Sequence, residues 1–194
     1  MRNPFILLMV MLCSSCAQLP PAPIPGAPPE QQAHAVVFDI DGTLTPRVFA
    51  VFDARPDAAN AVNTFAGKGY AIFYLSTRTR WLSAGIPGWL DKHHFPKGSV
   101  HVAQSDEDRR HPYDFKKRKL EEFIDRGWVL EFAYGDSSTD FAAYADVGIP
   151  KERVFALLRN GAPGCEGGDW NACLYGWTQH LEFIGNSVPS VPNK

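Results

Sequence analysis

Ala35-Val36-Val37-Phe38-Asp39-Ile40-Asp41-Gly42-Thr43-Leu44-Thr45 is the stretch that decides the fold. Its first four residues form an apolar run typical of a buried strand. Positions i and i+2 of a strand share a face, so Asp39 and Asp41 point at one centre if the extended geometry persists. Gly42 then permits a sharp departure of the chain. Two carboxylates this close disfavour each other unless a cation lies between them, and Mg²⁺ prefers such oxygen ligands. Taken alone, the stretch also fits a strand end followed by an Asp-Gly turn.

The composition indicates one globular domain with a sizeable core. The chain has 194 residues, of which 45% are hydrophobic and 21% are charged. Its 19 basic residues fall to 18 if Arg2 is removed with a signal peptide, against 21 acidic residues, which leaves a formal charge of −3. A charge of this sign does not support binding to nucleic acid.

The amino terminus has the layout of an export signal. Arg2 is followed by the apolar run 5–12 and then by small residues up to Cys16. The apolar run is far shorter than the ~20 residues that a membrane-spanning helix needs. Cys16, preceded by two serines, resembles the lipid-modified cysteine of the bacterial lipobox. We therefore predict a signal peptide at 1–15 and a lipid anchor on Cys16. An ordinary secreted protein cut nearby is the alternative.

Residues 16–32 are rich in proline and nearly uncharged. Such a segment favours the extended polyproline II conformation, with about 3.1 Å of rise per residue. It predicts a semi-rigid tether of up to about 50 Å between the anchor and a domain at 33–194. Ala17 is not the aspartate that retains some lipoproteins in the inner membrane, so we expect an outer-membrane protein that faces the periplasm.

The two remaining cysteines bracket a glycine-containing loop. Cys165 and Cys173 have a spacing that matches no zinc pattern. In an oxidising compartment such a pair favours a disulfide over a metal site.

Strand and helix patterns alternate along the domain. Apolar runs predict strands at 35–39, 70–75, 99–103, 129–134 and 153–158, whereas helical periodicity predicts helices at 56–68, 114–126 and 137–146, with an interrupted helical segment at 79–94. Strands that alternate with helices imply a parallel sheet with right-handed crossovers. The predicted fold is therefore a doubly wound α/β sheet with helices on both faces.

Polar residues gather where the predicted strands end. Besides Asp39 and Asp41, the clusters are Ser76-Thr77-Arg78, Lys116-Lys117 near a helix start, and Gly135-Asp136 with Asp140. In doubly wound sheets, ligands bind beyond the carboxyl ends of the strands. The clusters are thus expected to meet at one edge of the sheet.

Together these clusters resemble the four motifs of the haloacid dehalogenase (HAD) superfamily of phosphotransferases, over residues 35–158. The resemblance implies that Asp39 is a nucleophile that forms an aspartyl-phosphate, with Asp41 as general acid and base. It implies that Ser76, or less readily Thr77, binds a phosphoryl oxygen. Lys116, with Lys117 as the alternative, would stabilise the nucleophile and the developing charge.

The resemblance also implies a Mg²⁺ site. Its ligands would be Asp39, the backbone carbonyl of Asp41, and Asp136. Asp140 would bind either Lys116 or a metal-bound water.

A finer likeness is to the lipin-type catalytic domain, on Asp39 to Thr45, Tyr74 to Arg78, Phe115-Lys116, and Thr139-Asp140 with Tyr144 and 148–150. Lipins are Mg²⁺-dependent phosphatidic acid phosphatases, and related domains of phosphatidylinositol-transfer proteins only bind phosphatidic acid. This chain keeps both aspartates of the first motif, which favours catalysis, while Asp136 is closer to the general HAD pattern.

The intervals between the motifs are already filled by predicted helices and strands, so no cap domain is expected. An open site suits a phosphate on a bulky body such as a lipid. The alternatives are an exported phosphatase for soluble esters and a non-catalytic phosphatidic-acid-binding module. The apolar residues after the second motif, among them Trp81 and Trp89, fit either the core or a membrane interface.

Overall fold

The computed structural model describes residues 26–28 and 33–191. The predicted signal peptide, Cys16 and most of the predicted tether lie outside the described residues. Within the tether, the carbonyl of Gly26 accepts a hydrogen bond from Trp128 Nε1 at 3.0 Å. No helix in the described part is long and apolar enough to cross a membrane.

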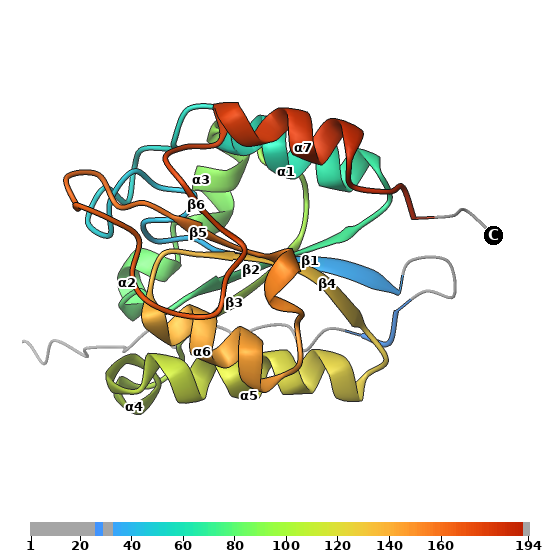
Figure 1. Ribbon diagram of the computed structural model, residues 1–194. Helices are drawn as coiled ribbons and strands as arrows, with labels where there is room; N and C mark the ends of the chain where they lie inside the picture. Colours follow the sequence, from blue (N-terminus) through green and yellow to red (C-terminus); the bar gives the residue numbers. More distant parts are fainter. Residues whose placement is uncertain (1–25, 29–32, 192–194) are drawn as a thin grey trace, which may run out of the picture.

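A six-stranded parallel sheet forms the centre of the described structure (Figure 1), in the order β3-β2-β1-β4-β5-β6. The strands are β1 (His34–Asp39), β2 (Ala71–Ser76), β3 (Ser99–Val102), β4 (Val129–Gly135), β5 (Val154–Leu157) and β6 (Ala172–Leu174). The apolar run at the start of the first motif becomes the central strand β1, which is buried on both faces. This confirms the predicted doubly wound α/β fold.

Helices cover both faces of the sheet (Figure 1). One face carries α1 (Ala58–Gly67), α3 (Ile86–Lys92) and α7 (Leu181–Asn186); the other carries α4 (Asp106–Arg110), α5 (Pro112–Asp125) and α6 (Ser138–Asp146). The short helix α2 (Arg80–Ser83) follows the carboxyl end of β2, and 3-10 turns lie at Lys151–Arg153 and Thr178–His180. Alternate residues of β1 point to opposite faces of the sheet. Phe38 packs in the core beneath α1, α3 and α7, and Val37 packs in the core beneath α5 and α6.

Stacked aromatic rings tie neighbouring strands together. Phe38 of β1 stacks on Tyr134 of β4 with ring centroids 5.2 Å apart, and Tyr134 stacks on Phe155 of β5 at 5.3 Å. Each such pair contributes about 0.5–1.5 kcal/mol beyond area burial. The rings therefore fix the strands whose ends carry the first and fourth motifs.

Three short elements, α4, β6 and α7, are absent from the sequence-based prediction. Helix α4 buries none of its residues and is defined by a capping box between Ser105 and Asp108. Strand β6 has three residues and pairs with β5, while α7 packs on α1. The predicted segment 79–94 splits into α2 and α3 near Gly85.

Because it contains a buried histidine, we expect the folded protein to lose stability at acidic pH. His101 Nε2 lies 2.6 Å from Ser99 Oγ, and its Nδ1 has no partner among the described residues. Burial lowers the pKa of His101 to about 3, helped by Lys119. The unfolded imidazole takes up a proton near pH 6.5 but the folded one does not, so stability falls as pH falls below about 6.5.

We expect His101→Phe to reduce the stability lost between pH 7 and pH 5 by about 2 kcal/mol. Phenylalanine keeps the ring contact with Phe123, whose centroid lies 4.7 Å away. Urea unfolding of both proteins at the two pH values measures the difference, in which the carboxylates common to both proteins cancel. An equal loss in the two proteins would contradict the assignment.

Candidate active site

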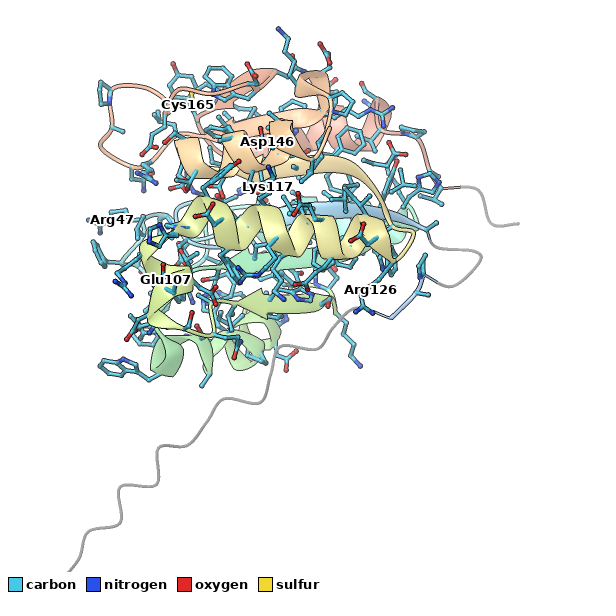
Figure 2. All side chains as sticks on the ribbon, turned by 90° about the horizontal axis from the view of Figure 1, so that it is seen from below. Arg47, Glu107, Lys117, Arg126, Asp146 and Cys165 are labelled. Atoms are coloured by element: carbon cyan, nitrogen blue, oxygen red, sulfur yellow. A yellow bond between two sulfur atoms is a disulfide. The ribbon has the colours of Figure 1, made fainter. Side chains whose placement is uncertain are left out.

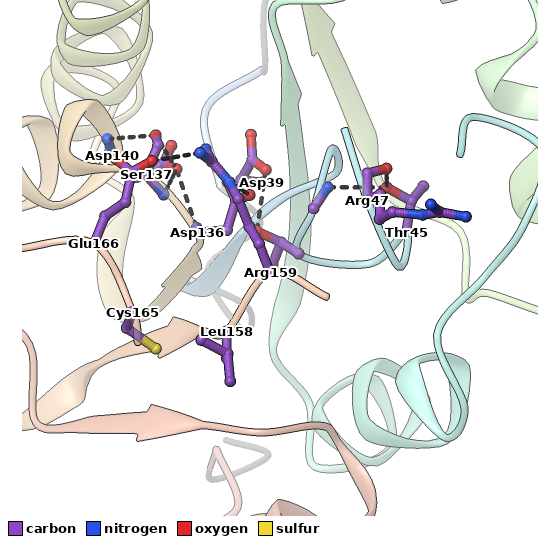
Figure 3. A network of polar contacts seen from close by, with 12 residues as sticks. Asp39, Thr45, Arg47, Asp136, Ser137, Asp140, Leu158, Arg159, Cys165 and Glu166 are labelled. Carbon is purple, nitrogen blue, oxygen red and sulfur yellow. Dashed lines mark hydrogen bonds and ion pairs between the residues drawn. The ribbon is translucent and has the colours of Figure 1, made fainter. Parts of the chain in front are cut away.

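The carboxyl ends of adjacent strands bring the predicted motifs together. Strand β1 pairs with β2 on one side and β4 on the other. Asp39 and Ser76 end β1 and β2, and Asp136 directly follows β4, so the three residues lie at neighbouring strand ends. Figure 3 shows Asp39 and Asp136 there. Lys116 reaches the same place from α5, which lies against one face of the sheet. The expected meeting of the four motifs at one edge is thus present.

Three buried carboxylates form the centre of the site. Asp39, Asp136 and Asp140 each offer an oxygen, and these oxygens lie within 4.8 Å of one another. Burial raises the pKa of Asp39 well above its usual value, against the opposing effect of Lys116. Burial likewise raises the pKa of Asp136 to about 6. Crowded, buried carboxylates of this kind are a donor set suited to a hard divalent cation.

Lys116, rather than Lys117, is the lysine that contacts the carboxylate cluster. Its Nζ lies 2.7 Å from Asp39 Oδ1 and also donates a hydrogen bond to Asp140 Oδ1. Burial alone would lower the pKa of Lys116, but the two carboxylates hold it above its ordinary value, so the ammonium stays charged. Lys117 is turned to the outside of α5 and pairs with Asp146 at 2.9 Å (Figure 2).

Asp41 is held away from this carboxylate cluster. Its Oδ2 accepts a hydrogen bond from Ser76 Oγ at 2.7 Å, and its Oδ1 accepts one from Arg78 Nε at 2.5 Å. The side chain of Asp41 is therefore not part of the carboxylate cluster, and only its backbone carbonyl is left for the predicted metal binding. Arg78 was missed by the sequence analysis as a site residue, although it lies within the quoted second motif. Thr77 is half-buried beside it.

Only glycine fits at position 42, because the backbone there has a positive φ and lies against the Asp136 carboxylate. The φ of Gly42 is +83°, and a Cβ at this position would lie 1.9 Å from Asp136 Oδ2. The Gly42 carbonyl accepts a hydrogen bond from the buried Arg55 at 2.5 Å, and Arg55 also binds the carbonyl of Leu158 at 2.7 Å. The backbone of the first motif thus packs directly against a carboxylate of the fourth.

A disulfide loop supports the carboxylate cluster from outside. Cys165 and Cys173 are bonded, which confirms the predicted disulfide, and their Cα atoms lie 5.8 Å apart. Glu166 in this loop binds Arg159, and its Oε2 accepts a hydrogen bond from the first backbone N–H of α6 (Figure 3). Arg159 Nε donates in turn to Asp136 Oδ2 at 2.5 Å. The sequence analysis missed Arg159 and Glu166, because neither lies in a motif.

The comparison with protein families decides the affiliation of the chain. A family model, the LNS2 domain of PITM 1–3, matches residues 36–158, a span that contains all four motifs. The chain belongs to the LNS2 family. No curated protein sequence matches this LNS2 protein significantly.

Solved structures agree with the fold of the LNS2 protein. A protein of Mesorhizobium loti described as a HAD-like phosphatase has a TM-score of 0.62 and 14% identity, with 88% of this chain and 91% of the other covered. Two chains from Pnkp1/Rnl/Hen1 RNA repair complexes have TM-scores of 0.55 and 0.52 at 18% and 17% identity, covering 73% and 76% of this chain. The matches span about half of those chains, 49% and 47%. The family match confirms the predicted likeness to the lipin-type domain, and the solved structures confirm the predicted HAD-like fold.

Proposed function

We propose that this LNS2 protein is a Mg²⁺-dependent phosphomonoester hydrolase that works through an aspartyl-phosphate on a phospholipid-type substrate such as phosphatidic acid. The observation that carries the proposal is the position of Asp39. It is buried at the end of β1, paired with Lys116 at 2.7 Å, and flanked by Asp136 and Asp140. A structural salt bridge would not require further carboxylates beside it. A nucleophile for an anionic substrate requires positive charge, which Lys116 and a cation held by these carboxylates would supply.

The residues divide the reaction into two steps. A carboxylate oxygen of Asp39 forms a bond to phosphorus while the ester P–O bond breaks, and Asp41 gives a proton to the leaving oxygen. Asp41 then takes a proton from a water that attacks the same phosphorus, which releases phosphate and restores Asp39. Lys116 orients Asp39 throughout and balances charge that builds on the phosphoryl oxygens.

Magnesium fits the donors that the site offers. Asp39, Asp136 and Asp140 would hold it together with the backbone carbonyl of Asp41, all of them oxygen ligands. When bound, the cation would offset the repulsion between the anionic nucleophile and the anionic phosphate.

Exposed aromatic side chains near the site support a substrate at a membrane surface. Phe49 and Phe52, in the loop that follows β1, are 94% and 74% exposed, and Trp81 on α2 is 83% exposed. The apolar residues of α3, including Trp89, belong to the core, so Trp81 stands apart from them. Both segments follow strand ends at the edge that carries Asp39. Exposed aromatics with a polar surrounding suit a lipid interface.

The lipid anchor on Cys16 belongs to the same proposal. It would keep the site beside its substrate at the outer membrane, on the periplasmic side. Incorporation of labelled palmitate that is lost in Cys16→Ser would support the anchor, and incorporation that persists would contradict it.

One assay separates the proposed activity from its rivals. Full-length protein in detergent is given Mg²⁺ with phosphatidic acid in mixed micelles and, separately, with p-nitrophenyl phosphate or nucleotides. Phosphate release from the lipid alone supports the proposal, while release from soluble esters indicates a broad phosphatase. No release, with binding to phosphatidic acid vesicles intact, would make the protein a binding module, which the LNS2 match favours as the second candidate.

We expect the triple variant Phe49→Ser, Phe52→Ser, Trp81→Ser to lose at least about 10-fold activity on phosphatidic acid vesicles, because each exposed ring contributes roughly 1–2 kcal/mol when it enters an apolar phase. Activity on a dispersed short-chain phosphatidic acid should stay within about twofold. Val129→Ser is the matched control, since Val129 is exposed at the amino end of β4, away from the site. Equal losses on both substrates would contradict a role in membrane contact.

A further inference from the structure

Both oxygens of the Asp41 carboxylate are bound by residues of the second motif. The donors are Ser76 Oγ at 2.7 Å and Arg78 Nε at 2.5 Å. The side chains of Arg78 and Asp41 are 4% and 13% exposed. A carboxylate held between a hydroxyl and a guanidinium presents its acceptors much as a phosphoryl group would.

Ser76 cannot bind a phosphoryl oxygen while Asp41 is in this position. A serine has one O–H to donate, and here it goes to Asp41. The Ser76 oxygen meanwhile accepts the backbone N–H of Arg78 at 3.1 Å. Phosphate binding by Ser76 therefore requires that the Asp41 carboxylate leave.

Arg78 has a donor to spare at the same place. Its Nη2 is buried and has no hydrogen-bond partner among the described residues. A buried donor left without a partner costs about 1–3 kcal/mol, so a ligand that supplies an acceptor gains from it. The cations that contact the carboxylate cluster are already committed: Lys116 binds two carboxylates, and so does Arg159. Arg78 binds one.

We propose that Arg78 is a phosphate-binding residue of this site, and that the Asp41 carboxylate occupies the phosphate-binding position until the substrate binds. The inference rests on the proposed phosphatase function. The incoming phosphoryl group displaces Asp41 from Ser76 and Arg78 and takes their donors. Asp41, set free, can then face the leaving oxygen. The ring of Trp89, with its centroid 5.8 Å from Arg78 Cζ, keeps the guanidinium in place while its partners exchange.

Binding of inorganic phosphate tests this exchange without any turnover. Calorimetry on the full-length protein in detergent, with Mg²⁺ present, gives the dissociation constant. We expect Arg78→Gln to weaken binding at least about 10-fold, and Arg78→Lys to weaken it less, because lysine keeps the charge but loses the planar fork. Arg110→Gln, on the exposed side of α4, should leave the constant unchanged.

The displaced carboxylate makes a second, sharper prediction. Asp41→Asn should bind phosphate roughly fivefold more tightly than the wild type, because the internal competitor is weakened. In the Arg78→Gln background the same substitution should give a smaller gain, because only the competition at Ser76 remains. A double-mutant cycle thus separates competition at Arg78 from a general loss of negative charge.

The binding results distinguish failure of the Arg78 assignment, of the exchange with Asp41, and of the proposed function. Unchanged binding by Arg78→Gln would overturn the role of Arg78, and an equal gain from Asp41→Asn in both backgrounds would overturn the exchange. A wild-type protein that binds no phosphate would instead overturn the proposed function. Circular dichroism and thermal unfolding check the fold of each variant. If Arg78→Gln does not fold, Arg78→Lys carries the test, and its binding equal to that of the wild type would overturn the proposal.

Discussion

Asp39→Asn is expected to lower kcat on a phosphomonoester by at least about 10⁴-fold while the protein stays folded. An amide has nearly the size of a carboxylate but does not form the acyl-phosphate, so the first chemical step is lost. Initial rates with saturating substrate and Mg²⁺ measure the loss. Acid-quenched wild-type protein should also carry a phosphoryl adduct on Asp39 that the variant lacks.

Stability separates this loss of chemistry from a loss of structure. Burial raises the pKa of Asp39, which means that the fold disfavours its ionised form. Removing that charge should leave the metal-free protein at least as stable at pH 7, since Lys116 keeps Asp140 as a partner. Mg²⁺ should stabilise the variant less than the wild type, because one ligand is gone. The control is Asp53→Asn in the exposed loop after β1. Near-normal activity of Asp39→Asn would remove Asp39 as the nucleophile.

Lys116→Met is expected to lower the free energy of unfolding by about 3–5 kcal/mol at pH 7 without added metal. The reason is that two buried carboxylates, Asp39 and Asp140, lose the cation that both of them contact. The cost should shrink toward pH 5, because the raised pKa of Asp39 lets that group become neutral earlier than usual. Urea unfolding at both pH values measures the effect, and turnover should fall by about 10²–10³-fold in parallel.

Lys117→Met is the matched control on the same helix. Lys117 pairs with Asp146 on the surface, and exposed pairs of this kind contribute about 0–1 kcal/mol. A larger loss of activity in Lys117→Met than in Lys116→Met would reverse the assignment of the motif lysine.

Much of the fold followed from local pattern. The apolar run 35–38 predicted the central strand because a strand buried on both faces needs no polar alternation. The longer helices were also predicted, since each shows its apolar period within one segment. Strand β6 and helix α7 were not, because each is short and exists through a partner distant in the chain: β6 pairs with β5, and α7 packs on α1.

The sequence by itself determined the residue types of the site: two aspartates and a glycine at the end of β1, a serine at the end of β2, and an aspartate directly after β4. Spacing along a strand decides which side chains share a face, and parallel strands end at one edge. The tertiary structure alone decided which distant groups touch. In the folded chain Lys116, and not Lys117, contacts Asp39. Arg159 binds Asp136, and Arg78 and Ser76 both bind Asp41. Contacts between residues as far apart as 77 positions depend on how helices and loops pack on the sheet, and no local pattern records that packing.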